Sequence, residues 1–252
     1  MKRSLPVLFL IGYFGVLIFL PIGFMAVRAA GAGWRVLAEQ ITRPEALYAL
    51  RLSLMTTVLA TIISTAAGAI LAYVLVRHDF RGKRFLNSLV ELPLALPPVV
   101  AGFMLILTFG PHSFLGTFLG RHGIKIIFAR PGLVIALLFV TFPFVVRAVQ
   151  SVLAELHPES EEAARTAGAS GWQIFWYVTF AEIRRGLYTG ATLAFARALG
   201  AFGSVAVVSG MIIGHTQTAP LYVWQTFMDF NLEGAFAMSL VLGISSFLLM
   251  FL

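Results

Sequence analysis

The chain has 252 residues, of which 59% are hydrophobic and only 12% charged. Soluble domains are about half apolar and about a quarter charged, so this composition excludes a water-soluble fold and predicts a membrane protein. The net charge of +7 is attributed to topology-setting loops rather than to nucleic-acid binding. With no cysteine, and with Asp79 and Asp229 as the only aspartates, the sequence offers neither a thiolate metal site nor an Asp-rich magnesium site.

Six apolar stretches approach or exceed the length that a helix needs to cross a membrane, about 20 residues. They cover residues 5–27, 52–76, 88–109, 131–149, 187–209 and 234–252. The predicted fold class is therefore all-α, with about six transmembrane helices in one domain over residues 1–252. The first stretch is longer than the apolar core of a signal peptide, so we interpret it as a spanning helix. Basic residues concentrated at 77–84 predict that this loop and both termini are cytoplasmic.

Prolines and glycines interrupt these stretches. Pro97 and Pro98 in the third stretch and Pro143 in the fourth predict kinked helices, packed around a cavity or moving against one another. A static kink is the simpler alternative. Gly186 and Gly190 form a GxxxG pattern that favours close contact with another helix.

The segment between the fourth and fifth stretches has a different composition. In the region 157–171, Pro158 and three glutamates suit the start of a short helix, and Gly168 suits its end. Ser170 and Gln173 have the spacing of a capping box, which predicts a second helix rich in aromatic residues. Ala163 and Ala164 give the first helix a small-residue side that would let another protein approach closely. A solvated acidic loop is the alternative.

These residues resemble a known motif. Glu162, Ala163, Ala164 and Gly168 are similar to the first half of the EAA motif of permease subunits of ATP-binding-cassette (ABC) importers, whereas Val178 and the following residues depart from its usual Ile-x-Leu-Pro end. Further segments resemble the sulfate/thiosulfate permeases, and molybdate and tungstate permeases share part of the pattern. These segments are residues 79–83, 98–102, 142–147, 195–205 and 208–210.

The resemblance implies a non-catalytic subunit of an oxyanion importer in a bacterial or archaeal inner membrane. Glu162, Ala163, Ala164 and Gly168 would form the coupling helix that docks on a dimer of cytoplasmic ATPase subunits. ATP and magnesium would bind to that partner, because this chain has no phosphate-binding loop of its own. A second permease subunit, identical or different, would complete the translocation path. A periplasmic or lipid-anchored binding protein would deliver sulfate or thiosulfate, with molybdate or tungstate as the alternative.

Arg197 is the one charge well inside a predicted span, where a charged side chain is costly and needs protein or water around it. The sulfate permeases carry a glutamate four residues later, where this chain has Ala201. Arg197 either attracts the anion or plays a structural role, pairing with Glu91, helix carbonyls or the partner subunit. Ser204, Ser209 and the loop 214–218 are further candidates for the anion path.

Two other functional classes fit less well. Residues 168–171 read Gly-Ala-Ser-Gly, the serine motif of rhomboid proteases, but charged residues precede Ser170 and the only later histidine, His215, falls in a predicted loop. His215 also lacks the spacing of a metal ligand. A secondary transporter or channel would have no use for an acidic, alanine-rich helix.

Overall fold

A computed structural model describes residues 4–155 and 159–250 of the chain, and helices are the only regular elements in these two ranges. The predicted all-α class is confirmed. The elements are α1 (Ser4–Ala32), α2 (Trp34–Thr42), α3 (Pro44–Arg77), α4 (Lys83–Ala95), α5 (Pro98–Phe109), α6 (Phe114–Arg121), α7 (Arg130–Glu155), α8 (Glu159–Thr166), α9 (Gly171–Ile174), the π-helix η1 (Phe175–Thr179), α10 (Phe180–Leu199), α11 (Gly203–Ser209), α12 (Ala219–Met228) and α13 (Leu232–Met250).

Each predicted span coincides with a helix or a helix pair, but two of them are not single helices. By length and composition, α3 and α7 can each cross a membrane on their own. The bent pairs α4–α5 and α10–α11 bring the number to four, and α1 and α13 contain shorter apolar segments, 12–28 and 232–248. A total of six spans therefore stays a prediction.

The third stretch was predicted as one kinked helix, and this is wrong. The chain bends by 115° between α4 and α5. Pro97 and Pro98 have no backbone N–H to continue the helix, and Leu96, which precedes them, adopts an extended conformation (φ −83°, ψ 136°). A second break, of 58°, separates α10 from α11 near Gly200. Pro143, by contrast, lies inside the continuous helix α7.

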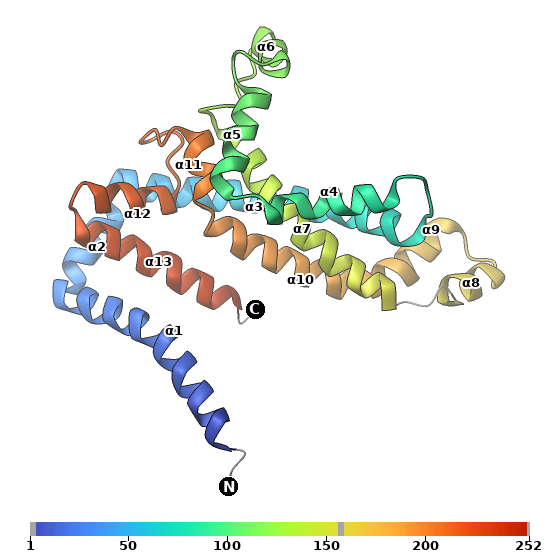
Figure 1. The fold of residues 1–252 in the computed structure, drawn as a ribbon, viewed down its shortest axis with the longest axis horizontal. Helices are drawn as coiled ribbons and strands as arrows, with labels where there is room; N and C mark the ends of the chain where they lie inside the picture. The colour runs from blue at the N-terminus through green and yellow to red at the C-terminus, as the bar shows by residue number, and fades with distance from the viewer. Residues whose placement is uncertain (1–3, 156–158, 251–252) are drawn as a thin grey trace.

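The centre of the molecule is a bundle of α3, α7 and α10, which run side by side along its long axis (Figure 1). Small residues allow the close approach. A Cβ atom placed on Gly190 would lie 2.9 Å from the Cα of Val145 in α7, and one on Gly186 would lie 2.8 Å from the carbonyl oxygen of Ala148. The predicted GxxxG contact is confirmed, because both glycines of α10 touch the backbone of α7.

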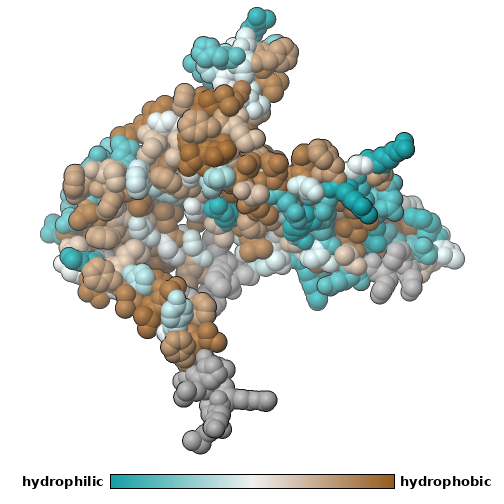
Figure 2. Space-filling model, viewed as in Figure 1, coloured by the Kyte–Doolittle hydropathy of each residue, from teal (hydrophilic) through white to brown (hydrophobic). Residues whose placement is uncertain are grey.

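The two ends of this bundle differ. In Figure 1, α8 and α9 lie at one end and α2, α11 and α12 at the other, while α5 and α6 form an arm that leaves the bundle. Figure 2 shows hydrophilic residues gathered around α8, α9 and the start of α4, and mostly hydrophobic residues over the middle. Large apolar side chains such as Ile70 and Leu107 are 68% and 77% exposed. This surface is suited to lipid rather than water.

Candidate functional site

The helix–turn–helix predicted between the fourth and fifth stretches is present. Helix α8 ends at Thr166, and Gly168 follows with φ +85°, a conformation that other residues adopt only with strain. The Ser170 hydroxyl accepts a hydrogen bond from the backbone N–H of Gln173, whose side chain bonds in return to the N–H of Ser170. The capping box is confirmed, and Ser170 serves as a helix cap. The predicted start of this segment, including Pro158, lies outside the described residues.

The four motif residues lie on an exposed helix and turn. Glu162, Ala163 and Gly168 are exposed and Ala164 is half-buried. Ala164 and Gly168 line an open pocket of about 380 Å³, together with Ile174 and Tyr177 of the following segment. Because the side chains on the α8 side are small, the backbone of α8 is accessible to a second molecule. This is the geometry that a docking helix requires.

The segment after the turn carries a cluster of aromatic rings. Trp176 packs against Trp172, Phe175 and Phe180, with ring centroids 5.6, 5.5 and 4.9 Å apart respectively. Trp172 is 71% exposed and Trp176 42%. Partly exposed tryptophans of this kind suit the boundary between lipid headgroups and water. The sequence did not predict the π-helical turn η1, in which the N–H of Phe180 bonds to the carbonyl of Phe175.

One acidic residue of α8 points back toward the bundle. The Glu161 carboxylate oxygen Oε1 lies 3.3 Å from Nη2 of Arg77, the last residue of α3, and accepts a 3.0 Å hydrogen bond from the hydroxyl of Thr179 in η1. The Arg77 and Glu161 side chains are only 13% and 15% exposed. Glu161 is one of the three glutamates that suit the start of this helix, and its pairing with Arg77 was not predicted.

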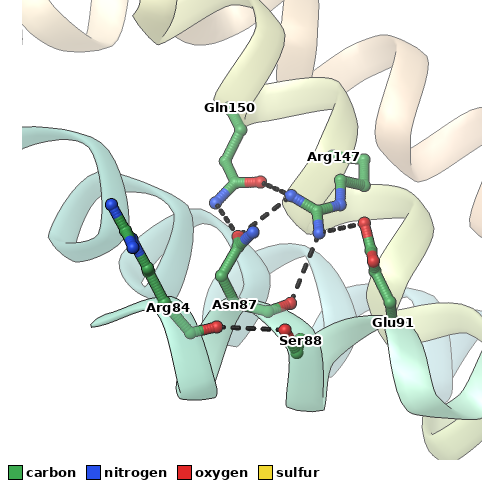
Figure 3. Close-up of polar contacts among 6 residues, drawn as sticks. All are labelled: Arg84, Asn87, Ser88, Glu91, Arg147 and Gln150. Atoms are coloured by element: carbon green, nitrogen blue, oxygen red, sulfur yellow. Dashed lines mark hydrogen bonds and ion pairs between the residues drawn. The ribbon is translucent and has the colours of Figure 1, made fainter. Parts of the chain in front are cut away.

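A second polar cluster joins α4 to α7 (Figure 3). Arg147 of α7 donates to the carboxylate of Glu91, to the amide oxygen of Asn87 at 3.0 Å and to Gln150 at 2.6 Å. Its Nη2 also bonds to the backbone carbonyl of Asn87. The pairing of Arg197 with Glu91, one of the sequence-based hypotheses, is therefore not the arrangement found, because Glu91 pairs with Arg147.

Arg197 lies instead at a cavity of about 270 Å³ beside the break between α4 and α5. The other lining residues are nonpolar: Pro93, Leu94, Leu96, Pro98, Ala101, Val140 and Phe144. The arginine is exposed within this single chain, and its guanidinium makes no hydrogen bond or ion pair to another described residue. Ala201, at the position where the sulfate permeases have glutamate, is buried.

The other candidates for the anion path do not line this cavity. Ser204 and Ser209 are 1% and 0% exposed and belong to α11, which packs against α5. The Ser209 hydroxyl already donates to the carbonyl of Ala206 and accepts from the N–H of Met211. In the loop 214–218, Thr216 donates to the carbonyl of Ser209, and His215 is exposed. These residues shape the connection between α11 and α12.

The all-helical fold, with an apolar surface suited to lipid and a short exposed helix at one end, is that of a membrane protein. Residues 64–252 match the family described as binding-protein-dependent transport system inner membrane component, and the chain belongs to this family. The fold agrees with that assignment. A bacterial ABC transporter that imports the acidic polysaccharide alginate superposes with a TM-score of 0.80 over 99% of this chain and 94% of that one, at 15% sequence identity.

Curated relatives are more similar in sequence. A sulfate transport system permease protein, CysW, from Synechocystis is 46% identical over 78% of this chain and 71% of its own length. The chloroplastic sulfate permease 2 of Chlamydomonas reinhardtii is 41% identical over 92% of this chain. The chain spans 63% of that algal protein.

Proposed function

We propose that the chain is the permease subunit of an ATP-driven importer and that sulfate or thiosulfate crosses the membrane along its helices. The observation that carries this function is the exposed helix α8 with its glycine turn, in a chain whose relatives bear the name sulfate permease. A short rigid helix transmits a displacement, whereas a flexible loop would absorb it. ATP hydrolysis belongs to a partner in this proposal, and the chain itself is not an enzyme.

The partners follow from the surfaces. A cytoplasmic ATPase dimer would dock on Glu162, Ala163, Ala164 and Gly168. A second permease subunit would cover Arg197, which is exposed in the single chain. A periplasmic or lipid-anchored protein would deliver the anion at the end that carries α2, α11 and α12. This orientation puts α8 in the cytoplasm, and with six spans it puts both termini there as well.

Arg197 is the residue that we propose to meet the anion. Its guanidinium has donors matched to an oxyanion, and it lies among nonpolar side chains that offer no competing acceptor side chain. A single arginine attracts the anion without holding it too strongly for release. Ser204 and Ser209 are left with a packing role, because both are buried away from this cavity.

The test is uptake of radioactive sulfate into proteoliposomes that contain the complete transporter, with its binding protein outside and ATP inside. We expect uptake to require ATP and to fall about 10- to 100-fold in Arg197→Met, the factor expected for losing a hydrogen bond from a charged group. Arg121→Met, at the exposed end of α6, is the matched control and should transport normally. Uptake without ATP would instead support a channel or secondary transporter. Transport of molybdate in preference to sulfate would support the alternative substrate.

A further inference from the structure

We infer that Glu161 is the positioning residue that ties the docking helix α8 to the membrane helices, through Arg77 and Thr179. This inference rests on the proposed function, because it concerns how a displacement of α8 reaches the translocation path. It adds a residue outside the four that were assigned to docking. Glu161 differs from them in direction, since it faces the bundle and they face outward or the open pocket.

One carboxylate oxygen of Glu161, in α8, contacts residues of both α3 and η1. Oε1 of Glu161 lies 3.3 Å from Arg77 Nη2 at the end of α3 and 3.0 Å from the Thr179 hydroxyl in η1. Thr179 is 2% exposed. A charge-assisted contact that is shielded from water resists rearrangement more strongly than one on the surface.

Most other residues of α8 are exposed and do not pack against the bundle. Between residues 160 and 166, Glu161 and Ala164 are half-buried and every other residue is exposed. Within the described part of the chain, α8 packs against α9 and η1, and a hydrogen bond from Arg77 joins it to α3. Glu161 therefore supplies a direct polar link between α8 and α3.

The elements that Glu161 joins lead to the proposed anion path. Thr179 is the last residue of η1, which continues directly into α10, and α10 carries Arg197 near its other end. Arg77 ends α3, which packs along both α7 and α10. A movement of α8 is therefore transferred to two of the three central helices at once. The π-helical turn at this junction fits a role in such a movement, because π-helical turns occur preferentially at functional sites.

The first test compares Glu161→Gln with Glu155→Gln in the reconstituted transporter. Glu155 ends α7 and is exposed, so its variant controls for the loss of one negative charge in this region. Glutamine keeps an acceptor oxygen but loses the negative charge, which weakens the hydrogen bonds from Arg77 and Thr179. We expect Glu161→Gln to keep ATP hydrolysis but to lower the number of sulfate ions imported per ATP about tenfold. Unchanged sulfate import per ATP in this variant would overturn the inference.

A second pair of variants keeps the test decisive if Glu161→Gln fails to assemble. Thr179→Val removes the hydroxyl at nearly constant volume, and Thr179→Ser retains it. We expect the valine variant to import less sulfate per ATP and the serine variant to match the wild type. Equal import per ATP by valine, serine and wild type would contradict the role of this hydrogen bond.

Double variants separate this inference from the proposed function. If Glu161 acts through Arg77, the losses in Arg77→Met and Glu161→Gln should not add when the two changes are combined. Additive losses would show that the two residues act independently and would overturn the inference. Failure of the wild-type chain to import sulfate with any ATPase partner would instead refute the proposed function.

Discussion

At the scale of single residues, two arginines of the membrane helices, Arg147 and Arg197, have different surroundings. Arg147 is held by Glu91, Asn87 and Gln150 between α4 and α7, and such a network fixes the relative position of two helices. Arg197 lies against nonpolar side chains, and its guanidinium makes no hydrogen bond to the described residues. Of these two arginines, Arg197 is therefore the one left available to an anion.

Gly168 allows a prediction about backbone strain. A Cβ atom there would meet nothing within 4 Å, so the only cost of a side chain comes from the positive φ, about 1–2 kcal/mol. We expect Gly168→Val to distort the turn and lower sulfate import per ATP. Gly168→Asn should retain most of it, because asparagine tolerates this conformation. Equal import by the two variants would show that the backbone conformation does not matter for coupling.

At the scale of the elements, local chemistry was predictable and tertiary pairing was not. The apolar stretches, the capping box of Ser170 and the turn at Gly168 depend on neighbouring residues, so the sequence alone predicted them. The Glu161–Arg77 and Arg147–Glu91 contacts join positions 84 and 56 residues apart. Nothing in a single sequence indicates which distant charges meet. The size of the bend at Pro97 also depends on how α5 packs against α11.

The π-helical turn leads to a prediction at this scale. A π-helical turn holds one residue more than an α-helical turn. Deleting Tyr177, which is 80% exposed, should let α9 continue into α10 as a regular helix and rotate α8 by about 100° relative to α10, the angle of one residue. Thr179 would then no longer face Glu161. We expect ATP hydrolysis without sulfate import, and unimpaired import would refute a role for η1.

The contact between α7 and α10 is expected to be sensitive to volume. Gly190→Val would place a side chain against the backbone of Val145 and should destabilise the chain by about 1–3 kcal/mol or more. Thermal unfolding in detergent measures this loss. Gly243→Val in α13 is the control, because a Cβ there meets nothing within 4 Å. Equal melting temperatures for the two variants would contradict the close packing.

At the scale of the whole molecule, the single chain exposes surfaces that suit other components. Its middle exposes large apolar side chains, and Arg197 is exposed as well. Both features fit a subunit that lipid surrounds on one side and a partner covers on the other. The polar end with α8 and the opposite end with α12 are then available to soluble partners (Figure 1).

The absence of native cysteine permits a direct test of this arrangement. Arg197→Cys introduces the only thiol, and we expect its labelling by membrane-impermeant reagents from each side to change when ATP binds to the partner. A cysteine at Tyr177, near α8, should react from the cytoplasmic side in both states. If the labelling of position 197 from each side is the same with and without ATP, a path that the ATPase opens and closes would be contradicted.

Helix α3 has one further consequence. Its 34 residues extend about 51 Å at about 1.5 Å per residue, well beyond a hydrocarbon core of about 30 Å. The helix must therefore tilt or extend out of the lipid, and its tilt depends on bilayer thickness. Arg77 is the last residue of α3 and pairs with Glu161. A change in acyl-chain length should therefore change the tilt of α3 and shift the position of Glu161. Lipid composition would thus tune the efficiency of sulfate import with no change in the protein.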